Sequence, residues 1–357
     1  MVSPSEKKSR ANALRHAQRL LRRHILIDGH NDLPWVIRKS DTAPADLDAH
    51  DLQRTLPGHT DLPRLRRGGV GAQFWSVFVP ASREAVADGG FARMQLEQID
   101  LARRMIARYP RDLALSWSAD DVTGAFAAGR IASLLGMEGG HVLENSLGVL
   151  RAYRELGARY LTLTHNSNTD WADSATDEPR HGGLTDFGRD VVAEMNRLAM
   201  LVDLSHVAPS TMSDALDTSM APVIFSHSSA RAICDVPRNV PDDILRRVPD
   251  NGGVVMVTFV AGFISAQSDS IPPTVADVAD HVEHIVRVAG VEHVGIGGDF
   301  DGTNHLPVGL ADVSTYPHLF AELVERGWND RDLTRLAGEN VLRVMSETEA
   351  VALRLAS

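Results

Sequence analysis

Short runs of apolar residues alternate along the chain with segments in which apolar residues recur at three- and four-residue steps. The continuous runs predict buried strands, and the stepped segments predict amphipathic helices. The expected strands are residues 25–31, 70–80, 131–137, 160–165, 201–206, 223–227, 253–260 and 293–300. The expected helices are residues 11–24, 91–108, 147–156, 187–200, 209–217, 242–247, 274–289, 316–326 and 330–345.

This order of elements indicates the fold class. Strands without polar alternation are buried on both faces, which is typical of a parallel sheet covered by helices. About eight such units in 357 residues predict a (β/α)8 TIM-like barrel, one domain over residues 1–357 with flanking N- and C-terminal helices. An open doubly wound sheet is the alternative, although no glycine-rich phosphate loop follows an early strand. Residues 41–63, rich in proline and aspartate, are expected to form a long loop.

Composition narrows the function. A formal net charge of −11 disfavours a nucleic-acid partner and favours a small substrate or a site for cations. Cys234 is the only cysteine, so a cysteine-based zinc site and an intramolecular disulfide are excluded. Lysine occurs only at Lys7, Lys8 and Lys39, so no mid-chain lysine is available to bridge two metals. Because no secretory signal or membrane-spanning segment is recognisable, we expect a cytoplasmic protein without a membrane partner.

Ionisable side chains gather where the expected strands end. His30 and Asp32 lie two apart at the end of the first strand, so both point to the same side of an extended chain. Other strands end at Glu138, His165, His206, His227 and Asp299. In a barrel, the C-terminal strand ends form one rim, and active sites lie there. We therefore expect these distant residues to form one site.

The residue types at this rim suit a metal. Imidazoles and carboxylates without thiols are typical of zinc, manganese or cobalt in a catalytic site. His30 with Asp32 and His206 with His227 form two ligand groups, which are too few for two separate closed sites. A shared carboxylate solves this count, and Glu138 is the natural bridge. Two ions bridged by Glu138 and a water or hydroxide would lower the pKa of that water towards neutrality.

Longer motifs resemble those of one family. The chain is similar over about residues 24–345 to the membrane (renal) dipeptidases, the M19 metallopeptidases of the amidohydrolase-like barrels. The resemblance rests on DGHNDLPW (28–35), QFWSV (73–77), GMEGGH (136–141), GVLRAYRELGARYLTLTHNSNTDWAD (148–173), GLTDFG (183–188), LVDLSH (201–206), FSHSSAR (225–231), PRNVPDD (237–243) and GIGGDFDG (295–302). It implies a zinc-dependent dipeptidase like the family's soluble bacterial members. Members of the family are often homodimers, so a homodimer is expected as a possible assembly.

The resemblance also implies the metal ligands. It assigns two zinc ions to each chain, one bound by His30 and Asp32 and the other by His206 and His227. Glu138 would bind both ions.

Three further residues have roles implied by the resemblance. His165 would stabilise the oxyanion, and Arg238 would bind the substrate's C-terminal carboxylate, for which a guanidinium group is suited. Asp299 would hold the free amine and relay the proton from water to the leaving nitrogen. A site with a cation for one end of the substrate and an anion for the other favours dipeptides, and the resemblance also implies that a D-residue is tolerated at the second position.

Two alternatives to a dipeptidase remain open. A related two-metal hydrolase would act on N-acyl-D-amino acids or β-lactams, and a degenerate barrel would bind metal without catalysis. Among the remaining ionisable residues, His281 and His284 are expected on a solvated helix face. His141 is expected to orient a ligand, and Asp301 to point the same way as Asp299.

Overall fold

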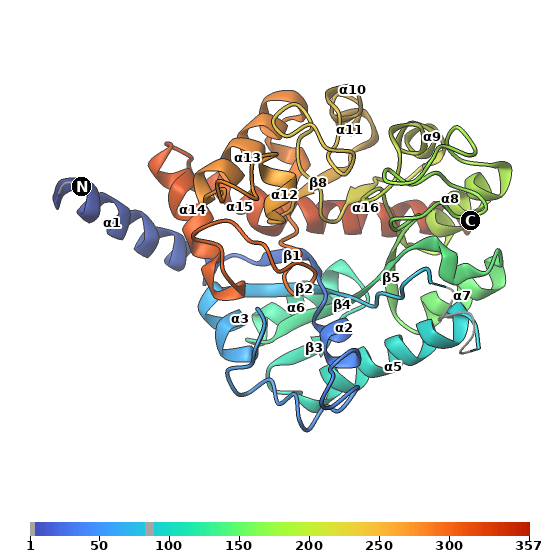
Figure 1. Ribbon diagram of the computed structural model, residues 1–357, viewed down its shortest axis with the longest axis horizontal. Coiled ribbons are helices and arrows are strands. Elements are labelled where there is room, and N and C mark those ends of the chain that lie inside the picture. The colour runs from blue at the N-terminus through green and yellow to red at the C-terminus, as the bar shows by residue number, and fades with distance from the viewer. Residues whose placement is uncertain (1–3, 83–88) are drawn as a thin grey trace.

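Parallel strands close into a barrel in this computed structural model, which describes residues 4–82 and 89–357 (Figure 1). The sheet order is β2-β1-β9-β8-β7-β6-β5-β4, and pairing of β2 with β4 closes it. This confirms the predicted (β/α)8 class. The eight barrel strands are β1 (Leu26–Asn31), β2 (Val70–Ser76), β4 (Ile131–Glu138), β5 (Ala158–Thr162), β6 (Leu201–Asp203), β7 (Ile224–Phe225), β8 (Val254–Val257) and β9 (Val294–Ile296).

A short additional strand, β3 (Leu113–Leu115), was not expected from the sequence. It pairs with the first half of β4, where Leu113 lies opposite Ile131, and β5 pairs with the second half, where Thr162 lies opposite Glu138. Three residues are too few for a recognisable periodicity, which explains why the sequence pattern did not predict this strand.

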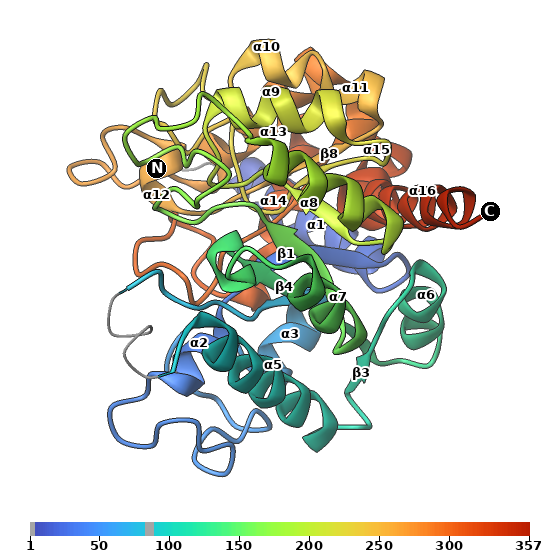
Figure 2. The same cartoon turned by 90° about the vertical axis from the view of Figure 1, so that its right-hand side faces the viewer.

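Helices cover the outside of the barrel (Figure 2). Their apolar stripes face the strands: Val278, Val282 and Ile285 on α13 are all buried. Within the described residues the α-helices are α1 (Pro4–Leu21), α2 (Leu33–Arg38), α3 (Leu62–Gly68), α5 (Phe91–Arg108), α6 (Ala119–Ala127), α7 (Leu147–Glu155), α8 (Asp186–Arg197), α9 (Pro209–Thr218), α10 (Asp242–Leu245), α11 (Val248–Asn251), α12 (Ala261–Ile264), α13 (Val275–Ala289), α14 (Tyr316–Glu325), α15 (Asp330–Thr334) and α16 (Asn340–Leu355).

The helices differ from the expected ones in several places. The predicted helix 330–345 is a continuous rod of α15, a π-helical turn and α16 that extends to Leu355. The short helix α2 follows β1 directly and was not expected. Pro34 occupies one of its first positions, where proline is favoured because the first helical N–H groups need no intrahelical partner. Within the described residues, no helix is both long and apolar enough to cross a lipid bilayer.

Apolar side chains fill the barrel interior below the rim. Phe74, Leu134, Tyr160 and Met256 are fully buried in one cluster. Gly136 on β4 makes room for the ring of Tyr160, because a Cβ atom at this position would overlap that ring. The packed interior leaves the C-terminal rim as the place for a polar site, as expected for this fold.

Candidate metal centre

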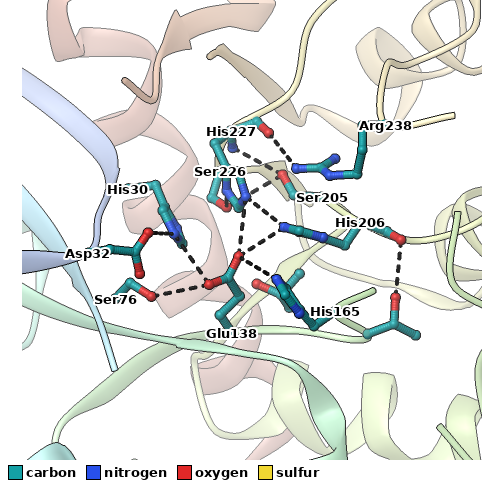
Figure 3. Close-up of polar contacts among 12 residues, drawn as sticks. His30, Asp32, Ser76, Glu138, His165, Ser205, His206, Ser226, His227 and Arg238 are labelled. Carbon is teal, nitrogen blue, oxygen red and sulfur yellow. Dashed lines mark hydrogen bonds and ion pairs between the residues drawn. The ribbon is translucent and has the colours of Figure 1, made fainter. Parts of the chain in front are cut away.

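Glu138, the last residue of β4, lies at the centre of the polar cluster (Figure 3). Its Oε2 atom is 3.5 Å from His30 Nε2, and its Oε1 atom is 2.9 Å from His206 Nε2 and 3.3 Å from His227 Nε2. Asp32 Oδ2 is 3.2 Å from His30 Nε2. The two carboxylate oxygens of Glu138 therefore face the two ligand groups that the sequence predicted, one oxygen to each group.

A tyrosine orients His30. The Tyr160 hydroxyl donates to the Gly29 carbonyl at 3.3 Å, so it accepts the hydrogen bond from His30 Nδ1, 2.8 Å away. This places the proton of the neutral imidazole on Nδ1 and leaves the lone pair of Nε2 directed at Asp32 and Glu138. Metal-binding histidines commonly have such a partner, which fixes both tautomer and ring orientation.

His227 is oriented in the same way through a serine. Ser226 Oγ donates to Asp203 Oδ2 at 2.6 Å, so it accepts from His227 Nδ1 at 2.8 Å. Asp203 is fully buried and also accepts hydrogen bonds from Thr162 Oγ1 and two backbone N–H groups. The lone pair of His227 Nε2 is thereby held towards Glu138. Sequence analysis missed Asp203, Ser226 and Tyr160, although all three lie in or next to the motifs that carry the site.

Replacing Ser226 by alanine should weaken metal binding by about 10- to 100-fold, the usual effect of losing a residue that orients a ligand. Competition with a chromogenic chelator measures this affinity. Ser229→Ala is the matched control, because Ser229 is also buried but its Oγ has no hydrogen-bond partner within the described residues. Equal metal affinity of the two variants would contradict the orienting role of Ser226.

A bound cation explains the positions of the polar atoms in this cluster better than hydrogen bonds among them do. His206 Nε2 and His227 Nε2 are 2.9 Å apart, although at most one of two neutral imidazoles in that arrangement can donate. Within the described residues, the buried atoms His30 Nε2, Asp32 Oδ1 and His206 Nδ1 have no hydrogen-bond partner. Buried polar atoms rarely remain unpaired in proteins. Ligand atoms of His30, Glu138 and His227 all lie within 4.8 Å of one another, as do those of Glu138, His165 and His206.

Protonation states agree with this assignment. Burial lowers the pKa of His206 and His227 well below the usual imidazole range, so both are neutral and can coordinate a metal. Burial opposes protonation of His30, but its neighbours Tyr160, Glu138 and Asp32 raise its pKa well above the usual range, so without a metal Nε2 carries a proton that a bound cation would replace. Burial opposes ionisation of Glu138, yet its neighbours, His30 first and then His206 and His227, lower its pKa well below the usual range. Negative charge buried at this depth requires a positive partner.

Two of the site residues have a left-handed backbone conformation. His206 and Asp299 have φ angles of 68° and 58°, in a region that costs a residue other than glycine about 1 kcal/mol or more. The chain turns sharply there, three residues beyond the ends of β6 and β9. The strands predicted over residues 201–206 and 293–300 are therefore shorter than expected, and strain of this kind is typical of functional sites.

A cavity of about 360 Å³ opens over the cluster and is lined by six of the eight predicted residues. This volume is at the lower end of the range of about 300–1,000 Å³ for small-molecule sites. His30 and His227 lie beneath the cavity floor, fully or almost fully buried. The structure thus brings all eight residues together, the six in the lining being Asp32, Glu138, His165, His206, Arg238 and Asp299.

Arg238 is almost completely buried in the cavity wall. Its guanidinium donates to the His227 carbonyl at 3.1 Å and lies over the ring of Phe263, 5.1 Å from the centroid. Within the described residues, its Nε atom has no hydrogen-bond partner. Burial lowers the pKa of Arg238 to about 10, so the group stays cationic at neutral pH. It can therefore bind an anionic group of a ligand.

Asp299 and His165 lie on other parts of the wall. Burial raises the pKa of Asp299 well above its usual range, and the adjacent carboxylates Asp32 and Glu138 contribute. Asp299 also groups with His30 and Asp32 as a further set of three ligand atoms within 4.8 Å, which the sequence did not suggest. Burial lowers the pKa of His165, so its imidazole is neutral, and its Nε2 is 3.9 Å from Glu138 Oε1.

Asp301 lines the same cavity as Asp299, and its Oδ1 accepts a hydrogen bond from the His59 N–H at 2.7 Å, which holds the loop before α3. The prediction for His281 was wrong. His281 is not solvated: it is fully buried, accepts from Ala230 N–H and donates to the Ile264 carbonyl. It fastens α13 to the loop after β7.

His284 and His141 have structural partners. His284 Nε2 lies 2.8 Å from Asp242 Oδ1, so this histidine pairs with α10. His141 Nε2 donates to the Val79 carbonyl at 2.9 Å, which ties the loop after β4 to the loop after β2. No hydrogen bond joins His141 directly to a predicted ligand among the described residues, so its role as an orienting residue has no support.

Known proteins share both the sequence and the barrel. The sequence profile of the membrane dipeptidase family, peptidase family M19, matches residues 14–357. Dipeptidase 3 from Rattus norvegicus is 48% identical over 338 residues, which are 93% of this chain. They are 67% of that protein, so the chain spans about two thirds of its length.

Solved structures with clear sequence similarity superpose closely. An amidohydrolase from Pseudomonas aeruginosa has a TM-score of 0.78 at 26% identity and covers 93% of this chain and 98% of its own. A metallo peptidase from Rhodobacter sphaeroides, liganded with a phosphinate mimic of the dipeptide L-Ala-D-Ala, has a TM-score of 0.80 at 26% identity. It covers 91% of this chain and 99% of its own.

The barrel and the ligand cluster at its rim define a metal-dependent hydrolase of the amidohydrolase-like class. The match to the family's sequence profile then identifies the family, and it is the one that the sequence motifs predicted. The chain belongs to the membrane dipeptidase family, peptidase family M19, and is a metallo-dipeptidase, a hydrolase of peptide bonds.

Proposed function

We propose that this chain is a zinc dipeptidase whose site holds two ions. His30 and Asp32 would bind one ion, His206 and His227 the other, and Glu138 both. The position of Glu138 carries this proposal, because one of its oxygens faces His30 and the other faces His206 and His227. When bound, the ions would supply an activated water and polarise the scissile carbonyl.

The substrate would be held by its two charged ends. The cationic, buried Arg238 would bind the C-terminal carboxylate, and Asp299 would bind the free amine. Arg238 and Asp299 both line the cavity of about 360 Å³. A site that binds both charged ends of its substrate selects for length, so a dipeptide would bind and a tripeptide would leave one of these groups unpaired.

Protein side chains would then move and stabilise charge. Neutral His165 would donate from its ring N–H to the carbonyl oxygen as negative charge develops there. The Asp299 carboxylate would accept the proton of the attacking water and pass it to the leaving nitrogen. The raised pKa of Asp299 supports this role, because a base that must release its proton works best when its pKa is near the working pH.

A D-residue at the second position should also be accepted. The Rhodobacter sphaeroides relative is liganded with a mimic of L-Ala-D-Ala, so a site of this fold accommodates that stereochemistry. Here the carboxylate of either isomer would still reach Arg238, since only the side chain changes direction.

Metal removal and restoration test this function. We expect chelated protein to lose hydrolysis of L-X-L-Y and L-X-D-Y dipeptides, and zinc to restore it at two ions per chain, as measured by elemental analysis. Tripeptides and N-acetylated amino acids serve as controls, since neither offers both charges at the right separation. Full activity at one ion per chain, or equal activity on N-acetylated substrates, would contradict the proposal.

A further inference from the structure

One wall of the cavity is formed by residues that have no role in the proposed reaction. It is formed by Trp35 and Lys39 from α2 and its C-terminal end, and by Phe78 after β2. The sheet order places β1 between β9 and β2, so this wall adjoins the loop that carries Asp299. Arg238 follows β7, on the other side of Asp299. The wall therefore lies beside the proposed amine position and away from the proposed carboxylate position.

Lys39 brings a positive charge to this wall. Its side chain is exposed and lines the cavity, and no ion pair or hydrogen bond of its ammonium group occurs within residues 4–82 and 89–357. The adjacent Arg38, in contrast, pairs with Glu97 at 2.8 Å and is not part of the lining. Among the residues that the structure describes, the ammonium group of Lys39 thus has no protein partner, and it is a second cation in the cavity besides Arg238.

The two aromatic rings complete a compartment for a short side chain. Trp35 and Phe78 pack edge to face with centroids 5.1 Å apart, and Phe78 is 4.8 Å from His165. Their faces can cover the methylene groups of a bound side chain, while Lys39 lies at its tip. A side chain with a short apolar stem and a terminal negative charge matches this combination.

We propose that Lys39 makes the enzyme prefer dipeptides with an acidic N-terminal residue, glutamate or aspartate. This inference rests on the proposed function, because binding of the amine by Asp299 is what directs the first side chain to this wall. The side chain of the second residue would point elsewhere, so an acidic second residue should gain little.

A comparison of charged and neutral isosteres tests this preference. We would measure kcat/KM for L-Glu-L-Ala and L-Gln-L-Ala, and for L-Ala-L-Glu and L-Ala-L-Gln, with the zinc-loaded protein. The first pair should show a preference for glutamate of about two- to fivefold, the range expected for a solvent-accessible ion pair. The ratio should fall as ionic strength rises.

Two substitutions locate the effect. Lys39→Met keeps the side-chain length and removes the charge, so the Glu/Gln ratio for the first residue should fall to about one. Arg38→Met removes the same charge one residue earlier and should keep the wild-type ratio, and Lys39→Arg should restore most of it. Metal content, measured in parallel, should be equal in all variants because Lys39 is not a ligand.

The outcomes separate this inference from the proposed function. An unchanged Glu/Gln ratio in Lys39→Met, or a ratio that appears only for the second residue, would overturn the role of Lys39 while dipeptide hydrolysis stands. Failure of the zinc-loaded wild type to hydrolyse any dipeptide would instead overturn the proposed function itself.

Discussion

Replacing Glu138 by glutamine should remove bound metal and activity together. The amide keeps the shape of the side chain, but one of its ends carries N–H donors and no negative charge. Because the two oxygens of Glu138 face different histidines, either orientation of the amide turns a donor towards one ligand group. Loss of an orienting residue alone costs about 10- to 100-fold in metal affinity, so loss of a shared ligand should exceed about 100-fold.

Elemental analysis and dipeptide kinetics on the same preparation measure this effect. Glu97→Gln is the matched control, because it makes the same chemical change at the Arg38 ion pair outside the cavity lining. The control should keep two ions per chain and wild-type kcat. A Glu138→Gln protein with two tightly bound ions would show that this carboxylate does not bridge.

Replacing Arg238 by methionine should have the second large effect, on substrate binding. Removing one partner of a buried charge pair costs about 2–5 kcal/mol, which is roughly 30-fold to several thousand-fold in kcat/KM. Most of the loss should be in KM, because the C-terminal carboxylate is bound in both the ground state and the transition state. Metal content should not change, since Arg238 donates to the backbone of His227 and not to its ring.

A C-terminal amide distinguishes recognition from general damage to the site. Wild-type enzyme should hydrolyse a dipeptide amide poorly, and Arg238→Met should hydrolyse it about as well as wild type does. Arg238→Lys should recover only part of the dipeptide activity, because an ammonium group cannot form the paired hydrogen bonds of a guanidinium group. Equal losses on both substrates would assign Arg238 a structural role.

The barrel was predictable from the period of the hydrophobic pattern. The grouping of its polar residues was predictable from their positions at the ends of the strands. Apolar strands of the right spacing imply a parallel barrel, and residues at strand ends then meet at one rim. His30 and His227 are nearly 200 positions apart, yet their ring centroids lie 3.9 Å apart. Closure of the sheet is enough to bring them together.

The details that the sequence did not predict depend on single partners. Asp301 holds the loop before α3 because its carboxylate accepts the N–H of His59, more than 240 residues earlier in the chain. His281 lies on a helix outside the barrel, but the loop after β7 covers it and provides a hydrogen-bond donor. Lys39 reaches the cavity because α2 begins at Leu33, next to the site. Such contacts have no periodicity, so a pattern of hydrophobic and polar residues does not show them.

Gly136 connects the packed interior of the barrel with the metal site at the rim. Because glycine has no Cβ atom, the Tyr160 ring fits across the barrel interior and its hydroxyl hydrogen-bonds to His30 on β1. A single methyl group added there would displace the phenol and leave that imidazole free to rotate. A substitution at Gly136 would therefore impair turnover, although this buried residue contacts neither solvent nor substrate.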